Sequence, residues 1–302
     1  MEVQKQNRPA RNQAIELLRT GAALGIVAFH AAIDGAAVFY AGLVVFLFLA
    51  SMMEVGPNWE RPRTAPQLAR RLLIPFVFWY LVYLAANVAF GRPPFPSLHP
   101  LTVIFAGPSV HLWFLPFIFA VLVLLNVAKR RVSAQGVLLV AATLAAVVLA
   151  AASWWRPVAG EFPVPVPQWA HAAAAVLLGA AFGAAGRNRG KAATVIAGVI
   201  ILAGLAALVV WPAPGVTAAY LIGVAGCTAA VALKQWVPER WNVQPVADCM
   251  FGVYLIHVLA LAAGGLVLPK NGLVLVMAAF AGSLLVVYVA RKYLPVTRWV
   301  LG

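Results

Sequence analysis

About ten apolar segments, each long enough to cross a bilayer, follow one another along this chain of 302 residues. A run of about 20 apolar residues satisfies its backbone hydrogen bonds in lipid as a helix. Charged residues make up only 10% of the chain, against roughly 25% in a soluble domain, so no sizeable soluble domain fits between the segments. We therefore expect an all-α, polytopic membrane bundle forming one domain over residues 1–302, with a short cytoplasmic arm at residues 1–12. The expected helices cover residues 13–33, 37–53, 72–90, 111–128, 136–154, 169–186, 192–211, 215–233, 246–268 and 272–290.

Two of these segments, 169–186 and 215–233, are rich in Ala and Gly. Small side chains let helices approach closely in lipid, where tight packing replaces the hydrophobic effect as the main attraction. We therefore expect both segments to lie in the interior of the bundle.

The Lys and Arg residues predict the orientation of the chain, because cytoplasmic loops carry an excess of them. With ten helices and a cytoplasmic N-terminus, all but four of the 22 Lys and Arg residues fall on the cytoplasmic side. Arg92, Arg156 and Lys270 fall outside, and Arg19 falls in the membrane. A miscounted helix would destroy this alternation, so we expect both termini in the cytoplasm.

The net charge of +14 does not indicate nucleic-acid binding. The charge is divided among short segments and does not form one patch with interleaved aromatic residues, which a nucleic-acid surface would need. Anionic lipid headgroups are the expected partners. A second role is open at Arg70 and Arg71, where the phosphates of a cytosolic cosubstrate could bind, although topology alone explains either residue.

Charged and titratable residues inside the first apolar segment predict a functional site. Arg19 and His30 are eleven positions apart, which at about 100° per residue places them on one helix face, and Glu16 lies near that face. Such groups are costly in a membrane unless they face protein or a water-filled cavity. The alternative for Glu16 and Arg19 is a structural ion pair near the membrane surface. Asp34 follows His30 by one turn and is either its partner or, more simply, a turn residue before a glycine.

Four motifs, in this order along the chain, resemble the membrane acyltransferase 3 family. Its first helix carries an Arg, ten further residues and a His, as Arg19 and His30 do here. The motifs are ELLR at 16–19 with Phe29-His30, RLLIPF at 71–76 with Phe78-Trp79, HLWFLP at 111–116, and FGVYLIH at 251–257. The chain departs from the family at Glu16, where Asp is usual, at Val44, where the second helix usually carries Asp, and at Ala50-Ser51, where Ser-Gly is usual.

The resemblance implies O-acyl transfer from a cytosolic acyl-CoA, with acetyl-CoA the first candidate, to a hydroxyl of a glycan or a lipid-linked sugar. Attack of an alcohol on a thioester needs a base, and an imidazole with an ordinary pKa near 6.5 suits that task. His30 is the expected base, and direct attack by its imidazole is the variant. Arg19, held by Glu16, would neutralise phosphate or carbonyl charge, with Arg70 and Arg71 as further cosubstrate ligands.

Other polar residues of the motifs are candidates for substrate binding. His111 and Trp113 open a helix at the outer interface and could meet the acceptor or simply anchor the helix. Tyr254 and His257 lie near mid-membrane and could bind substrate or lock the bundle through a hydrogen bond. His99 and His171 match no motif and are expected to be loop and packing residues, and no metal-binding spacing is present.

The spacing of Arg19 and His30 gives the reaction a direction. Eleven residues rise about 16 Å along a helix, so Arg19 lies in the cytoplasmic half and His30 toward the outside. We expect acyl-CoA from the cytosol and an acceptor from the outer side of a bacterial inner or plasma membrane. The alternatives are a transporter or flippase of a lipid-linked glycan, and a catalytically impaired family member.

Overall fold

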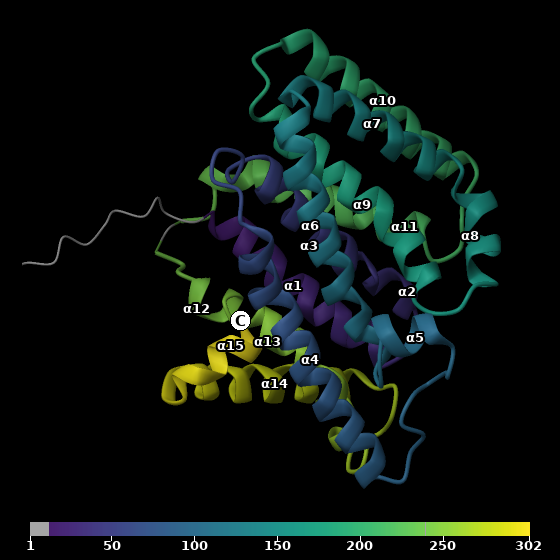
Figure 1. The fold of residues 1–302 in the computed structure, drawn as a ribbon, viewed down its shortest axis with the longest axis vertical. Helices are drawn as coiled ribbons and strands as arrows, with labels where there is room; N and C mark the ends of the chain where they lie inside the picture. Colours follow the sequence, from purple (N-terminus) through teal and green to yellow (C-terminus); the bar gives the residue numbers. More distant parts are fainter. Residues whose placement is uncertain (1–11, 239) are drawn as a thin grey trace, which may run out of the picture.

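The computed structural model describes residues 12–238 and 240–302, which form helices and connecting loops with no strand among them (Figure 1). The arm expected at residues 1–12 lies outside the described part of the chain except for Asn12. The helices are α1 Gln13–His30, α2 Ala36–Phe39, α3 Ala41–Val55, α4 Ala65–Ala89, α5 Pro100–Phe105, η1 Val110–Trp113, α6 Phe114–Arg131, α7 Ala134–Ala150, α8 Ala152–Gly160, α9 Val166–Ala185, α10 Lys191–Val210, α11 Thr217–Ala232, η2 Leu233–Gln235, α12 Gln244–Ala247, α13 Met250–Gly264, α14 Leu273–Tyr293, η3 Pro295–Thr297 and α15 Arg298–Leu301.

Seven helices in the described part of the chain are long and apolar enough to span a membrane, and the number rises to eight if a bent pair counts as one span. The protein is therefore an all-helical, multi-pass membrane bundle. Helices are also present at the other two expected positions, but each lacks one property of a span. α1 carries Glu16, Arg19 and His30 within 18 residues, and α13 has only 15 residues. The sequence predicts about ten spans, and seven or eight helices of the described residues meet the length and hydropathy of a span.

The bent pair corrects the helix expected at residues 136–154. α7 ends at Ala150, and α8 continues at an angle of 72° to it. The indole of Trp155 donates to the carbonyl oxygen of Val148 at 2.7 Å, which supplies a partner to a carbonyl that the ended helix no longer uses. The chain therefore turns across the end of the bundle where a straight helix was expected.

Short polar side chains fix where several helices begin. The side chain of Asn12 accepts a hydrogen bond from the backbone N–H of Ala14 at 3.0 Å and starts α1. Thr64 and Gln67 form a reciprocal capping box at the start of α4. Ser133 caps α7 in the same way as Asn12 caps α1.

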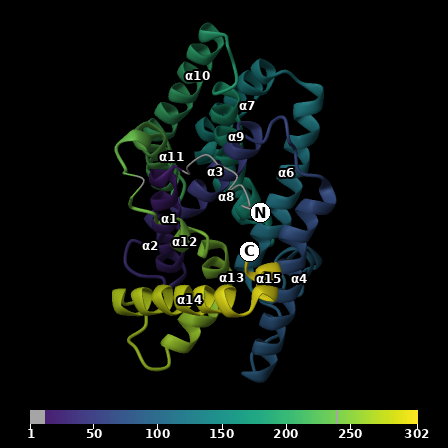
Figure 2. The same cartoon turned by 90° about the vertical axis from the view of Figure 1, so that its left-hand side faces the viewer.

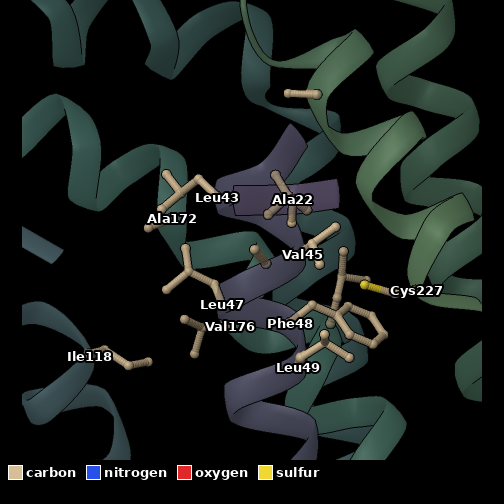
Figure 3. Packing of buried hydrophobic residues seen from close by; sticks show 14 of the residues in the cluster. Ala22, Leu43, Val45, Leu47, Phe48, Leu49, Ile118, Ala172, Val176 and Cys227 are labelled. Atoms are coloured by element: carbon tan, nitrogen blue, oxygen red, sulfur yellow. The ribbon is translucent and has the colours of Figure 1, made fainter. Parts of the chain in front are cut away.

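α3 is the central helix of the bundle and packs against α1, α6, α9 and α11. Its Leu47 and Phe48 are fully buried. Leu47 points to the side of Val176 and Phe48 to the side of Cys227 (Figure 3). Gly179 of α9 lies so close to α3 that a Cβ there would collide with the carbonyl oxygen of Phe48.

The expectation that both Ala- and Gly-rich segments are interior is confirmed for α9 only. In the 18-residue apolar stretch of α9, 61% of the residues are buried, against 33% in the corresponding stretch of α11. α11 therefore packs one face and exposes the other. At the far edge of the fold, α14 lies across the direction of α4 in both views (Figures 1 and 2). α14 packs mainly on α13, and α13 in turn packs on α1.

Candidate functional site

His30 is the last residue of α1 and lies at the mouth of a cavity. The helix stops there because the next residues form a turn in which Ala32 has a φ of 51° and Gly35 a φ of 73°. The His30 side chain is exposed, and within the described part of the chain it makes no hydrogen bond. An imidazole held on a helix end with both ring nitrogens unused is free to contact a ligand.

Two further imidazoles converge on His30 from distant parts of the sequence. The ring centroid of His257, from α13, lies 5.0 Å from that of His30. His111, from η1, lies 5.2 Å from His257 and 6.1 Å from His30. The sequence predicts each histidine as a site residue but does not predict that the three meet.

The hydrogen bonds of these rings indicate where their protons lie. Nδ1 of His257 is 2.6 Å from the carbonyl oxygen of Tyr254, and a carbonyl can only accept, so Nδ1 carries the proton. The Nε2 atom of His257 is buried and has no partner in the described part of the chain, which leaves a lone pair available. Nδ1 of His111 is 2.9 Å from the hydroxyl oxygen of Ser109, and its Nε2 is also buried without a partner.

Tyrosines fix the elements that carry these rings. The hydroxyl of Tyr254 donates to the carbonyl oxygen of His111 and so ties α13 to η1. The hydroxyl of Tyr83, on α4, donates to the carbonyl oxygen of Leu255 at 2.8 Å. Tyr254 therefore makes an interhelical hydrogen bond of the kind that the sequence offered as its structural alternative, and it also lines the cavity. Tyr83 was not expected at the site, and its position on α4 gives no signal of it.

The cavity beside His30 has a volume of about 280 Å³. Small-molecule sites occupy roughly 300–1,000 Å³, so this cavity has room for one sugar-sized group. Its lining residues come from loops and helix ends at the His30 end of the bundle. They are Ile26, Phe29, His30, Ala37, Tyr40, Leu43, Val110, His111, Trp113, Arg156, Pro167, Gln168, His171, Gly215 and Tyr254.

Comparison with known proteins decides the family to which the chain belongs. The family model for an acyltransferase domain, acyltransferase 3, matches residues 12–292 and so includes every residue of the cavity. The chain belongs to the acyltransferase 3 family. No curated protein and no solved structure matches it. The resemblance found in the four sequence motifs is therefore confirmed.

In this acyltransferase 3 protein, one group of predicted site residues lies together and another lies apart. His30, His111, Trp113 and Tyr254 line the cavity, and His257 contacts three of them, His30, His111 and Tyr254. The guanidinium of Arg19 lies toward the other end of α1 and is paired with Glu16, whose carboxylate oxygen is 2.7 Å away. The ion pair weighed as the structural alternative for these two residues therefore forms.

The predicted cosubstrate arginines also lie away from the cavity. Both Arg70 and Arg71 are exposed in the first turns of α4. Arg70 borders a separate apolar groove along α4 that also includes Phe78 and Val300. These arginines and the imidazoles therefore occupy different surfaces of the protein.

Polar residues without a predicted site role also line the cavity. His171, expected to be a packing residue, is buried and its Nε2 has no partner in the described part of the chain. Arg156 and Gln168 line the same wall. His99 is a loop residue as expected, where its ring accepts from the backbone N–H of Leu101 at the start of α5. Asp34 lies in the turn before Gly35, in the turn position that the sequence favoured.

The departure from the family at Val44 has a packing explanation. Val44 is buried and faces Gly223 of α11, where a Cβ would lie 2.7 Å from its Cγ1 atom. A carboxylate at this position would be pressed against an apolar helix without hydrogen-bond partners. Ser51, at the second departure, is also fully buried, and its hydroxyl has no partner in the described part of the chain.

The three imidazoles do not form a metal site. Among residues 12–238 and 240–302, no group of three His, Cys, Asp or Glu side chains is placed to hold a metal ion. The three imidazoles offer one exposed ring beside two buried ones, an arrangement that suits proton transfer.

Proposed function

We propose that this protein is a membrane-bound O-acyltransferase of a bacterial inner or plasma membrane. It would transfer an acyl group, acetyl in the simplest case, from cytosolic acyl-CoA to a sugar hydroxyl on a cell-surface glycan or a lipid-linked precursor. One observation carries the proposal: His30, His111 and His257 converge on a cavity with room for one sugar. Family membership supports acyl transfer as the chemistry.

His30 acts as the general base in the proposed reaction. A ring nitrogen accepts the proton of the acceptor hydroxyl as its oxygen attacks the thioester carbonyl, and a C–O bond forms. The C–S bond then breaks, and the imidazolium returns the proton to the departing thiolate. The products are the ester and free CoA thiol. The variant with a transient acyl-histidine uses the same residue as a nucleophile.

His257 supports that cycle by its position. Its Nδ1–H is committed to the carbonyl of Tyr254, so its Nε2 can accept a hydrogen bond from His30. Such a bond stabilises the imidazolium that forms when His30 takes a proton, as a carboxylate does in a serine-protease triad. His111 and Trp113 form part of the wall that the acceptor would contact.

The cosubstrate would enter from the end of the bundle that carries the basic residues. In this proposal Arg70 and Arg71 meet the phosphates of CoA, while Arg19, oriented by Glu16, neutralises charge along the route to His30. If the chain crosses the membrane ten times with both termini in the cytoplasm, as the sequence predicts, these groups lie on the cytosolic side. The cavity at His30 then faces the outside, where the acceptor enters.

Transfer of radiolabel from acetyl-CoA in membranes tests the proposal. Membranes with the wild-type protein are expected to label a lipid or glycan fraction, and His30→Ala is expected to lower the rate by about 10²- to 10⁴-fold, the usual contribution of a general base. His99→Ala is the matched control, because His99 caps a loop helix away from the cavity. Labelling that persists in His30→Ala would remove His30 from the mechanism. Transport of a lipid-linked glycan without dependence on acyl-CoA would favour the transporter instead.

The side of the membrane from which the acceptor enters has its own test. In vesicles of known orientation, transfer should require acetyl-CoA on the cytosolic face and acceptor on the opposite face. Transfer with the acceptor confined to the cytosolic face would contradict the proposed direction.

A further inference from the structure

Arg156 is a guanidinium in the cavity wall, and no carboxylate among residues 12–238 and 240–302 forms an ion pair with it. The ion pairs within the described part of the chain join Arg19 to Glu16, Arg63 and Lys129 to Glu54, and Arg187 to Glu60, and none includes Arg156. Its side chain is only partly exposed and lines the cavity that contains His30. A cation in such a place is costly unless it meets a counter-charge.

The groups around Arg156 also have unused hydrogen-bonding capacity. His171 is 3% exposed, lines the same cavity, and its Nε2 has no partner in the described part of the chain. The side-chain oxygen of Gln168, also in the cavity wall, is buried and unpartnered among the same residues. Tyr40 lines this cavity together with Arg156 and His171. A cation and two neutral polar side chains therefore face one small space.

The fold holds Arg156 in this position. α8 turns 72° from α7, and the hydrogen bond from the Trp155 indole to the carbonyl of Val148 fixes that turn. Ala152 and Ala159 are buried on one side of α8, which keeps the helix against the bundle. Arg156 therefore belongs to a built wall of the cavity.

We propose that Arg156, with Gln168 and His171, binds an anionic group of the acceptor, a carboxylate or a phosphate on the sugar whose hydroxyl reaches His30. This inference rests on the proposed function, because it names the class of acceptor for that site. A guanidinium presents paired N–H donors that match a carboxylate or phosphate. A cavity of about 280 Å³ holds one ring, so the anion and the reacting hydroxyl lie on the same or adjacent sugars.

Ligand binding without acyl transfer tests the site. The thermal unfolding temperature of the purified protein in phosphatidylcholine nanodiscs would be measured in the presence of D-glucuronate and of D-glucose. The two sugars differ only by a carboxylate in place of a hydroxymethyl group. D-glucose 1-phosphate is the phosphate probe. We expect at least one anionic sugar to raise the melting temperature and glucose not to, because a ligand that binds the folded state stabilises it.

Variants assign that effect to Arg156. Arg156→Gln should weaken binding of the anionic sugar by about tenfold or more, since hydrogen bonds between charged groups contribute at least that factor. Arg92→Gln is the matched control, because Arg92 lies on another loop over the ring of Phe90 and should leave binding unchanged.

The outcomes distinguish this inference from its alternatives. Equal effects of glucose and the anions, no effect of any of them, or binding that survives Arg156→Gln would overturn it. An Arg156-dependent shift produced by phosphatidylglycerol alone would identify a lipid-headgroup anchor and would also overturn it. If the anion binds through Arg156 while membranes show no acyl transfer, the proposed reaction fails and the site remains.

Discussion

Nζ of Lys129 lies 2.8 Å from the Oε1 carboxylate oxygen of Glu54, and both side chains are buried. The pair joins the last turn of α6 to the last turn of α3, at the opposite end of these helices from the histidine cavity. Lys129 also donates to the backbone carbonyl oxygens of Glu54 and Asn58 at 2.9 and 3.2 Å. The ammonium therefore closes the loop after α3 onto α6.

Removal of Lys129 alone should destabilise the protein strongly. After Lys129→Met, the one remaining ion-pair partner of the buried Glu54 carboxylate in the described part of the chain is Arg63, 3.9 Å from its other oxygen. Breaking one side of a buried ion pair costs about 3–5 kcal/mol. Thermal unfolding in nanodiscs measures the loss, and the double variant Glu54→Gln/Lys129→Met should recover part of it.

Arg130→Met is the control for that pair, because Arg130 is the exposed neighbour of Lys129. It should change the unfolding temperature little, since isolated surface charges contribute about 0–1 kcal/mol. If the two single variants lowered the unfolding temperature equally, the buried Lys129–Glu54 pair would contribute no more to stability than an exposed charge.

His257 should act on turnover through His30. His257→Gln removes the ring whose centroid lies 5.0 Å from that of His30, and with it the hydrogen bond proposed to stabilise the imidazolium, a loss that costs about 1.5–3 kcal/mol. We therefore expect kcat to fall by about one to two powers of ten, with KM for acetyl-CoA unchanged. Steady-state transfer assays on the purified protein give both constants.

A structural role for His257 predicts a different pattern. If His257 only locked the bundle, His257→Gln would lower the amount of folded protein and leave the kcat of that folded fraction unchanged. His99→Gln controls for the substitution itself, because His99 lies in an exposed loop.

Gly42 controls how closely α1, the helix that carries His30, approaches α3. A Cβ at this position would collide with the backbone carbonyl oxygen of Ala22. Gly42→Ala should therefore push the two helices apart and cost about 1–3 kcal/mol, the usual penalty for overpacking. Thermal unfolding and the acyl-transfer rate should both decline.

Gly198→Ala is the matched control for Gly42→Ala. Gly198 is also inside a helix, α10, but no atom lies within 4 Å of a Cβ built there. Ala favours the helix over Gly by roughly 1 kcal/mol, so this variant should be neutral or stabilising. A loss at Gly198 as large as at Gly42 would contradict the close-packing argument.

Local rules predicted which residues share a helix, but they did not predict which helices are neighbours. The eleven-residue spacing placed Arg19 and His30 on one helix, and α1 carries both. The meeting of His30, His111 and His257 depends on the packing of α13 beside α1 and of η1 beside both. That arrangement follows from the shapes of side chains far apart in the sequence, and helix periodicity carries no information about it.

The distribution of Lys and Arg residues also could not predict where individual side chains point. It assigned Lys129 to the cytoplasmic surface and Arg156 to the outer surface. The side chain of Lys129 turns inward because Glu54 faces it from another helix. Arg156 reaches the cavity because the chain bends after Ala150, where a run of alanines gives no turn signal. In both cases a tertiary contact decided the direction of a side chain that sequence alone left undetermined.

The native cysteines make the expected topology directly testable. Cys227 and Cys249 are both buried, which shields their thiols from reagents in water. Wild-type protein should therefore take up little membrane-impermeant maleimide. In intact cells Ser97→Cys should be labelled from outside, whereas Arg131→Cys and Trp299→Cys should be labelled only after permeabilisation. All three positions are exposed, so access depends on the side of the membrane. Labelling of Trp299→Cys in intact cells would mean an odd number of crossings before it, and either α1 or α13 would then lose its role as a span.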